Sequence, residues 1–231
     1  MGKNLSMFLW FIATGDTYRL LFTRFGYSIP KIGRLIKSLA ILISKNPSQY
    51  ITHNLLPDSV VTQKWLFDRS YNQPDCMAAM DGVFVQINRP RRHGKSYYSG
   101  RKKAYGLCML AAVYFNSKFI YVNVGNSARM GASLIFQCSS FKTAIENGNS
   151  SISENNEILV DSSFSPAPYL VKSTERIGSG SARVLVEHVF GQFKQQFRLF
   201  LNRSSLHPKQ HTRVLYASAI IFNIMKKVNS K

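Results

Sequence analysis

The stretch Cys76-Met-Ala-Ala-Met-Asp-Gly-Val-Phe-Val85 places a single carboxylate, Asp81, inside an otherwise apolar run. From Met77 to Ile87 apolar and polar residues alternate in part, which predicts a β-strand. An unpaired carboxylate enclosed by apolar side chains either costs several kcal/mol or takes up a proton, so it needs a cation or hydrogen bonds. The stretch therefore predicts a strand that carries an acid with a special partner.

Two further acids have similar surroundings. Asp161 directly follows the apolar run Ile158-Leu-Val160, and Glu187 lies between Val184-Leu-Val186 and Val189-Phe190. Acids are few in this chain, which has 11 Asp and Glu and 30 Lys and Arg. A divalent metal ion is one cation that would hold such acids. For each acid taken alone, a helix cap, a turn or an ordinary ion pair is the alternative explanation.

The remaining pattern after residue 75 predicts strands first and helices later. Two strands, Tyr105–Phe115 and Phe119–Val124, are joined at Asn116-Ser117 as an antiparallel hairpin. The later elements expected are a helix over Leu134–Ile145, a short buried strand over Glu157–Val160, an amphipathic helix over Ala182–Phe200 and a last helix over Arg213–Lys227. The core face of the amphipathic helix is expected to consist of Val186, Val189, Phe193, Phe197 and Phe200. This order predicts an α/β fold with a mixed sheet flanked by helices.

The first sixty residues predict helices instead. One covers about Leu5–Thr14, a second runs from Asp16 or Thr17 to about Phe25, and a third starts near Ser28 and Pro30 after the turn Gly26-Tyr27. Two helices joined by a short Gly-containing turn predict a helix-turn-helix unit. We expect three regions: a helix-turn-helix module at 1–46, a proline-bearing connector at 47–75, and a mixed-sheet domain at 76–231.

The third helix has a basic face. Lys31 and Arg34 lie near its start, where the second helix of a helix-turn-helix unit reaches phosphates or base edges in the major groove. The sequence thus predicts DNA contact through Lys31 and Arg34. An ordinary three-helix packing unit with a solvated basic face is the alternative.

Charge is the strongest feature of the composition. The formal net charge is +19 at pH 7, which predicts attraction to polyanions, nucleic acid first and an anionic membrane second. Seven of the cations fall within fifteen residues, at Arg89, Arg91, Arg92, Lys95, Arg101, Lys102 and Lys103. Such a cluster repels itself unless a polyanion lies between its members, and the interleaved Tyr97 and Tyr98 can stack on bases or sugars. A nuclear-localisation signal is the plainer explanation, and both can hold.

The apolar stretches and the cysteines restrict the location. The longest apolar run, Met7–Ala13, is too short to span a bilayer, so no membrane-spanning helix is expected and no membrane is counted among the partners. Cys76, Cys108 and Cys138 form no Cys-x-x-Cys pair of the kind that binds zinc. They predict buried thiols in a reducing compartment.

Four segments together resemble the Harbinger/PIF transposase family and the nucleases derived from it. They are Met80-Asp-Gly-Val-Phe84, Tyr97-Tyr-Ser-Gly-Arg-Lys-Lys-Ala-Tyr-Gly-Leu107, Leu159-Val-Asp-Ser-Ser-Phe164 and Arg183-Val-Leu-Val-Glu-His-Val-Phe-Gly-Gln-Phe-Lys194. The N-terminal Phe11-Ile-Ala-Thr-Gly-Asp-Thr-Tyr-Arg19 is similar to the helix-turn-helix of that family. The resemblance therefore covers nearly the whole chain.

The resemblance implies a ribonuclease-H-like fold for the domain at 76–231 and a nuclease activity. Asp, Asp and Glu in this family bind Mg²⁺ or Mn²⁺ for DNA strand cleavage, and the matching positions are Asp81, Asp161 and Glu187. Arg183 and Lys194 match the family pattern on the late helix and are expected to contact phosphates of DNA. The family also implies a nuclear location and a Myb/SANT-like DNA-binding partner.

The chain departs from the family in one acid. A His-Asp pair is usual after a Pro-Gly-Ser turn, and Gly131-Ala132 occupies its place here. The segment from Asp161 to Glu187 is also shorter than usual and lacks the Tyr-Asn that precedes the late helix. Loss of a carboxylate weakens a hard-cation site. The start of the chain at the first helix further suggests a truncated N-terminus.

Three functions follow from these observations. The first is a metal-dependent DNA endonuclease of transposase origin, whose activity the missing acid would weaken or abolish. The second is a domesticated DNA-binding protein whose catalytic site no longer works. The third, an RNA-binding basic protein of ribosomal type, fits the charge but leaves the three acids unexplained.

Overall fold

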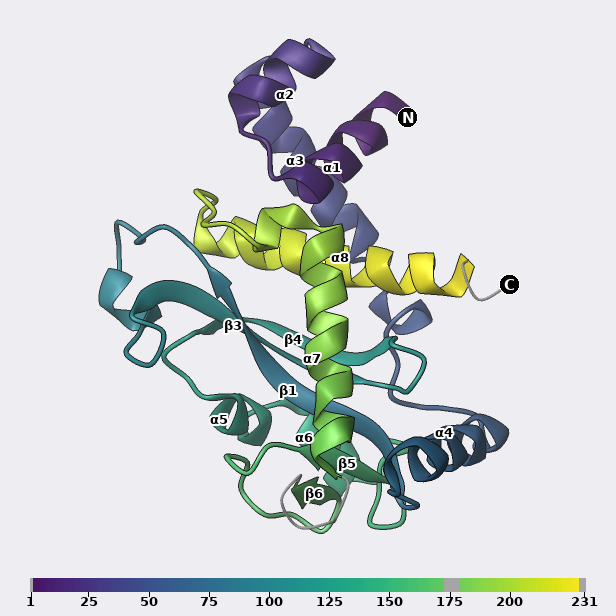
Figure 1. Ribbon diagram of the computed structural model, residues 1–231. Coiled ribbons are helices and arrows are strands. Elements are labelled where there is room, and N and C mark those ends of the chain that lie inside the picture. Colours follow the sequence, from purple (N-terminus) through teal and green to yellow (C-terminus); the bar gives the residue numbers. More distant parts are fainter. Residues whose placement is uncertain (1, 173–178, 229–231) are drawn as a thin grey trace.

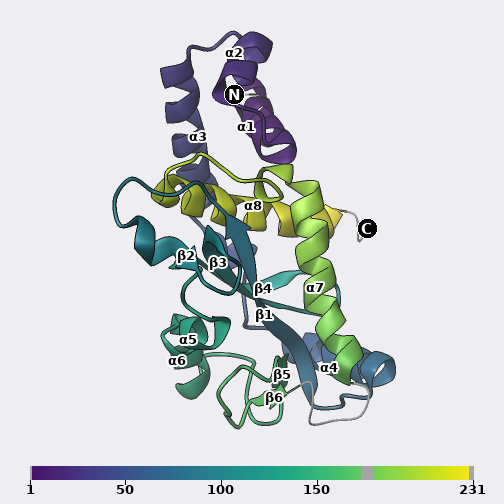
Figure 2. The same cartoon turned by 60° about the vertical axis from the view of Figure 1, so that its left-hand side comes forward.

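The computed structural model describes the backbone of residues 2–172 and 179–228, together with the side chains of these ranges except those of residues 179–183. A curved mixed sheet lies at the centre, with helices against both of its faces (Figure 1). The N-terminal helices form the far end of the molecule, beyond helix α8 (Figure 2).

The sheet is built around two long antiparallel strands. Its strands are β1 (Cys76–Gln86), β2 (Tyr98–Ser99), β3 (Ala104–Val113), β4 (Phe119–Ser127), β5 (Glu157–Val160) and β6 (Leu170–Lys172). β3 pairs antiparallel with both β1 and β4, β5 runs parallel to β1, and β6 runs parallel to β5. β2 pairs with the first residues of β3. This mixed sheet fits the ribonuclease-H-like fold that the resemblance implies.

Side chains of the central strands alternate between two hydrophobic clusters. On β3, Met109 and Ala111 belong to the cluster on the α7 and α8 side, whereas Cys108 and Leu110 belong to the cluster that contains α5 and α6. The sequence of a strand that is buried on both faces is apolar at nearly every position. This explains why the sequence alternates only in part.

The helices surround this sheet. They are α1 (Gly2–Thr14), α2 (Tyr18–Phe25), α3 (Ile29–Ile43), α4 (Pro57–Tyr71), α5 (Ala132–Gln137), α6 (Ser140–Glu146), α7 (Ser179–Gln196) and α8 (Pro208–Val228), with 3-10 turns η1 (Pro47–Gln49), η2 (Gly94–Tyr97) and η3 (Arg198–Phe200). Helix α7 crosses the sheet and contacts β1, β3 and β5 (Figure 1). The five side chains expected on the core face of the amphipathic helix, Val186, Val189, Phe193, Phe197 and Phe200, are all buried.

The three N-terminal helices begin and end close to the predicted residues. Thr17 caps α2 by accepting a hydrogen bond from the Leu20 amide at 3.4 Å, and Gly26 ends it with a φ of 70°. Helix α3 packs on α8, and residues of α1 and α3 share one hydrophobic cluster with α7. The helices are therefore confirmed, whereas the module boundary at residue 46 and the helix-turn-helix function stay predictions.

Several elements differ from expectation. The connector contains a full helix, α4, although its sequence shows only a short helical pattern, around Val60–Phe67, between Pro57 and Pro74. The helix expected over 134–145 is two helices, because Ser139 interrupts the first and caps the second by accepting from the Lys142 amide at 3.2 Å. Strand β6 was not predicted, since three residues are too few to show a period. Over residues 2–172 and 179–228, no helix is long and apolar enough to cross a membrane.

Candidate active site

Pairing of two parallel strands brings Asp81 and Asp161 to one place. Ala79 on β1 pairs with Leu159 on β5, and each aspartate follows two residues later in its own strand direction. Residues two apart on a strand face the same side of a sheet. Because β5 ends at Val160 while β1 continues to Gln86, that edge of β1 is no longer covered by β5 beyond this point.

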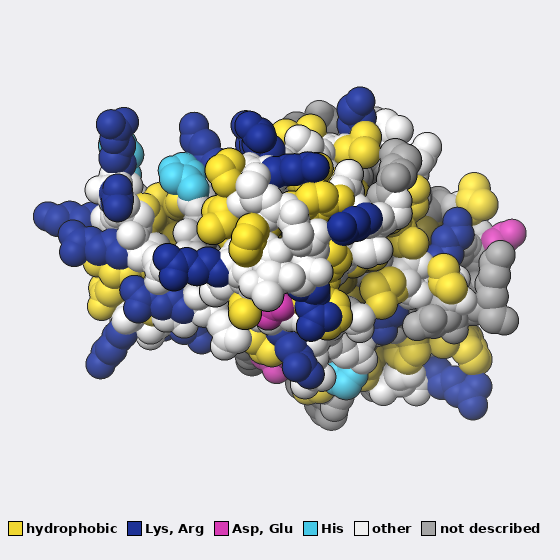
Figure 3. All heavy atoms as spheres, turned by 90° about the horizontal axis from the view of Figure 1, so that it is seen from above, with side chains coloured by type: hydrophobic (Ala, Val, Ile, Leu, Met, Phe, Trp, Pro, Cys, Tyr) yellow, Lys and Arg dark blue, Asp and Glu magenta, His cyan; other side chains and the backbone are white. Residues whose placement is uncertain are grey.

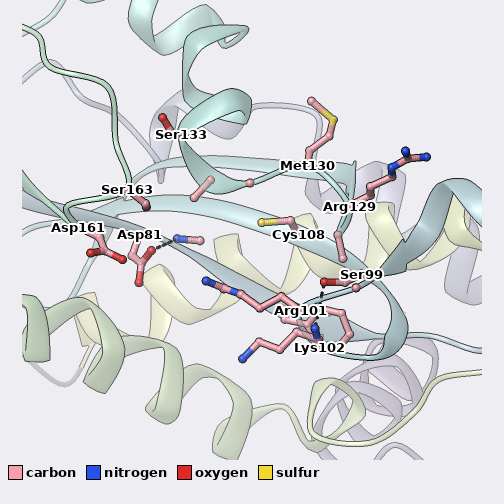
Figure 4. Close-up of a pocket in the computed structure, with 16 residues that line it drawn as sticks. Asp81, Ser99, Arg101, Lys102, Cys108, Arg129, Met130, Ser133, Asp161 and Ser163 are labelled. Atoms are coloured by element: carbon pink, nitrogen blue, oxygen red, sulfur yellow. Dashed lines mark hydrogen bonds between the residues drawn. The ribbon is translucent and has the colours of Figure 1, made fainter.

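A cavity of about 380 Å³ opens beside this edge. It is lined by Asp81, Gly82, Phe84, Ser99, Gly100, Arg101, Lys102, Cys108, Ala128, Arg129, Met130, Gly131, Ala132, Ser133, Asp161 and Ser163. In Figure 4 the carboxyl groups of Asp81 and Asp161 lie beside each other, and Arg101 and Lys102 reach toward the same space from the opposite side. Two of the three predicted acids therefore share one cavity.

Both carboxylates are half-buried and locally held. Asp81 Oδ1 accepts a hydrogen bond from the Gly82 amide at 2.7 Å, and Asp161 Oδ1 accepts one from the Ser162 hydroxyl at 3.1 Å. The Phe164 amide donates to the Asp161 carbonyl at 3.1 Å, which forms a turn directly after β5. These bonds fix the orientation of two acids that the sequence predicted to need partners.

Three cations line the same cavity. Arg101 and Lys102 were predicted as phosphate contacts, whereas Arg129 was not. Arg129 lies two residues before Gly131-Ala132, the pair that replaces the missing His-Asp, and this position near the departure from the family is the signal that would have identified it. Three cations against two carboxylates suit a phosphate group together with a bound metal ion.

The prediction that apolar neighbours bury Glu187 is wrong. Glu187 is exposed on α7, whereas Val186 and Val189 are buried. Consecutive helical residues point about 100° apart, so an apolar run does not enclose an acid in a helix as it does in a strand. Glu187 is not among the residues that line the cavity.

The three acids do not form one ligand group in the described part of the chain, where no three His, Cys, Asp or Glu side chains lie close enough to hold a metal ion. The two aspartates alone fit a hard cation such as Mg²⁺, which is usually held by one or two carboxylates plus water and substrate phosphates. Glu187 is nevertheless carried by a helix that packs directly on β1 and β5.

Lys194 fastens that helix to the sheet. Its Nζ donates to the Phe84 carbonyl of β1 at 2.7 Å. Burial lowers the pKa of the Lys194 ammonium group, and the nearby Lys102 lowers it further. The Arg183 side chain lies outside the described residues, so its predicted role is not addressed.

The other predicted cations are distributed over different surfaces. Arg91 and Arg92 line a separate groove, and Lys95 lies in η2 between that groove and the cavity. Lys103 adopts a left-handed φ of 49° in the turn that leads into β3. Lys31 and Arg34 are exposed on α3, with Lys31 Nζ 4.2 Å from the centre of the Tyr27 ring.

The cysteines were predicted to be buried, which holds for two of them. Cys76 and Cys108 are buried thiols, but Cys138 is exposed because it follows the last turn of the short helix α5. Cys108 lines the cavity, and burial raises the pKa of its thiol to about 11, with Asp81 raising it further and Arg101 opposing. The thiol is therefore protonated at neutral pH.

The residues in place of the missing His-Asp pair also line the cavity. Ala132 lies so close to Gly82 that a Cβ placed on Gly82 would come within 2.7 Å of the Ala132 Cβ. The side chain of an acid at position 132 would therefore start next to Gly82, the residue that follows Asp81, and would lie in the cavity lining.

Comparison with known proteins identifies the family. The model of the DDE superfamily endonuclease family matches residues 80–223, a range that spans both aspartates, Glu187 and most of α8. Comparisons with curated proteins and with solved structures gave no significant match. The fold, the cavity and the family match agree, and the chain belongs to the DDE superfamily endonuclease family.

Proposed function

We propose that the protein is a divalent-metal-dependent DNA endonuclease of transposase origin, of the Harbinger/PIF type, that hydrolyses phosphodiester bonds. The observation that carries this proposal is the pair Asp81 and Asp161, which share one cavity with Arg101, Lys102 and Arg129 in a chain of the DDE endonuclease family. Oxygen ligands of this kind favour Mg²⁺ or Mn²⁺.

The chain's own residues divide the work at the cavity. Asp81 and Asp161 would hold the metal ions, with Glu187 of α7 as the proposed third acid. When bound, such ions supply an activated water and stabilise the leaving 3′ oxygen of an in-line displacement. Arg101, Lys102 and Arg129 bind the non-bridging oxygens of the phosphates on either side of the scissile bond.

DNA recognition is assigned to the basic surfaces that surround this site. We propose that Lys31 and Arg34 on α3 contact the duplex, and that Lys95, Lys103, Arg183 and Lys194 add further phosphate contacts. Support for this comes from the net charge of +19 and from the resemblance of the N-terminal helices to a helix-turn-helix unit. The resemblance also suggests a nuclear location and a Myb/SANT-like partner.

A plasmid-nicking assay tests the proposal. Purified protein with Mn²⁺ or Mg²⁺ is expected to nick supercoiled plasmid, and Asp81→Asn is expected to lower the rate by at least about 100-fold, since it removes a ligand charge from the site. Asp58→Asn, the same change at an exposed position on α4, is the matched control and should cleave normally. Equal rates for wild type and Asp81→Asn would contradict the assignment of this cavity.

The second candidate function is a DNA-binding protein with a non-functional catalytic site. It is favoured by Gly131-Ala132 in place of a His-Asp pair and by the absence of a three-acid group within the described residues. It predicts that wild type and Asp81→Asn bind duplex DNA with the same affinity and that neither cleaves it. The same two proteins, assayed for binding as well as nicking, therefore separate the two functions.

A further inference from the structure

A groove distinct from the cavity lies along the first half of the basic segment Arg89–Lys103. It has a volume of about 890 Å³ and is lined by Asn88, Arg89, Pro90, Arg91, Arg92, His93, Tyr97, Ser205, Leu206, His207, Pro208 and Lys209. One wall is the loop after β1, and the other is the segment that leads into α8. Figure 3 shows Lys and Arg side chains gathered at the end of the molecule where this loop protrudes in Figure 1.

Backbone hydrogen bonds fix the two walls to each other. The Asn88 amide donates to the Ser204 carbonyl at 2.8 Å, and the Ser204 amide donates to the Gln86 carbonyl at 3.4 Å. Ile87 and Ser204 form an isolated parallel bridge. The two walls are therefore joined at Asn88 and Ser204, which lie more than a hundred residues apart in the sequence.

The lining offers hydrogen-bond donors and positive charge without a carboxylate. Arg89, Arg91, Arg92 and Lys209 contribute four cations. His207 Nδ1 accepts from the Lys209 amide at 3.3 Å, so in the neutral ring Nε2 carries the proton and is a donor. Like charges held together in this way repel one another until an anion neutralises them. The chemistry fits a chain of phosphates.

The groove also contains an aromatic ring. Tyr97 is half-buried in the lining, whereas the neighbouring Tyr98 already packs against Tyr105 with ring centres 5.2 Å apart. A positively charged groove with an available aromatic ring is the usual combination in proteins that bind single-stranded nucleic acid, because bases stack on the ring while cations follow the backbone. A base-paired duplex keeps its bases stacked inside and cannot use Tyr97 in this way.

The same short segment separates this groove from the catalytic cavity. Residues Arg89–His93 and Tyr97 line the groove, and Ser99–Lys102 line the cavity. Between them, the Ser127 hydroxyl at the end of β4 donates a hydrogen bond to the Ser96 carbonyl. The segment is thus anchored at its middle, and one nucleic-acid strand can follow it from one site to the other.

We propose that this groove binds a single-stranded DNA segment that flanks the phosphodiester cut in the cavity, an assignment that rests on the proposed nuclease function. The phosphates lie against Arg92 and Lys209 on opposite walls, and a base stacks on Tyr97. The groove makes the protein prefer DNA with an unpaired flank over a fully paired duplex.

Fluorescence anisotropy with labelled oligonucleotides tests this inference. Binding of single-stranded DNA, single-stranded RNA and duplex DNA is measured in EDTA, so that cleavage plays no part. For Arg92→Gln/Lys209→Gln, the affinity for the single strand should fall roughly tenfold near 0.1 M salt, and the slope of log affinity against log salt should decrease by about 0.7 for each lost contact. Tyr97→Leu should weaken single-strand binding without changing that slope.

Matched controls separate the groove from charge in general. Lys45→Gln/Arg69→Gln removes two exposed cations elsewhere and should keep single-strand affinity within about twofold. Equal losses of single-strand affinity in the two double variants would overturn the proposal. Competition by a polyglutamate peptide as strong as that by unlabelled single-stranded DNA would also overturn it. Loss confined to the RNA oligonucleotide would overturn the assignment to DNA. Single-strand binding is measured in EDTA and nicking with Mn²⁺, so failure of the nuclease and failure of the groove are separate outcomes.

Discussion

The strand side and the helix side of the candidate active site are held in different ways. Asp81 and Asp161 are positioned by the register of β1 and β5, and each carboxylate has a local hydrogen bond. Glu187 is positioned by the packing of α7, whose valines and phenylalanines determine which way the helix faces. The pairing of two strands can shift only by whole residues, whereas a packed helix can rotate or slide by small amounts. The strand acids are therefore the more rigid half of the site.

The largest expected effect tests this difference directly. Asp161→Asn should lower Mn²⁺ affinity without DNA by about 100-fold, because it removes one of two carboxylates that share the cavity. Glu187→Gln should lower Mn²⁺ affinity by less than about threefold, since Glu187 is exposed and outside the cavity lining. Isothermal titration of both variants gives the comparison. Equal losses would mean that Glu187 joins the two aspartates in solution.

A buried histidine tests how firmly the helix side is held. His211 of α8 is fully buried, packs edge-on against the Phe200 ring, and makes no hydrogen bond through its ring nitrogens to the described residues. Burial lowers its pKa to about 4. The unfolded chain takes up this proton near pH 6.5 and the folded protein does not, so the contribution to stability is complete above pH 6.5 and is lost as pH falls toward 4.

Between pH 7 and pH 5 this loss amounts to about 2 kcal/mol. His211→Phe, which keeps an aromatic ring against Phe200, should remove this part of the acid sensitivity. Urea unfolding at both pH values measures it. His93→Asn serves as the control, because His93 is exposed and asparagine tolerates its left-handed backbone. An unchanged pH dependence in His211→Phe would show that other groups control acid unfolding.

The strand side was also the more predictable from sequence. Apolar runs in the sequence predicted the limits of β1, β3 and β5, because such runs are typical of buried strands. The same runs drew attention to Asp81 and Asp161. Helical segments were located well, but the burial of Glu187 was inferred from neighbours in sequence that point to other sides of a helix. The groove beside the basic segment joins residues 88–97 to 205–209, and no local pattern predicts such a pairing.

An acid restored beside the strand acids, at the first residue of α5, should strengthen the site. Ala132→Asp places a carboxylate in the cavity lining, next to Gly82, and is expected to raise Mn²⁺ affinity and nicking rate together, by about tenfold. Ala132→Asn has nearly the same shape without the charge and should change neither quantity. The idea would be falsified if wild type cleaves efficiently and Ala132→Asp alters neither affinity nor rate, since the absent acid would then have no part in this chemistry.

The smallest expected effect concerns the helices farthest from the cavity. Lys31→Gln and Arg34→Gln remove exposed charges from α3, and each lost phosphate contact should lower the salt slope of duplex binding by about 0.9 while leaving Mn²⁺ affinity unchanged. Lys45→Gln, just beyond the end of α3, is the matched control. If α3 reads a groove, Arg34→Gln should also alter sequence preference in a binding selection, whereas Lys31→Gln should weaken all sequences alike. Slopes equal to that of the control would leave both residues as solvated charges and remove α3 from the DNA-binding surface.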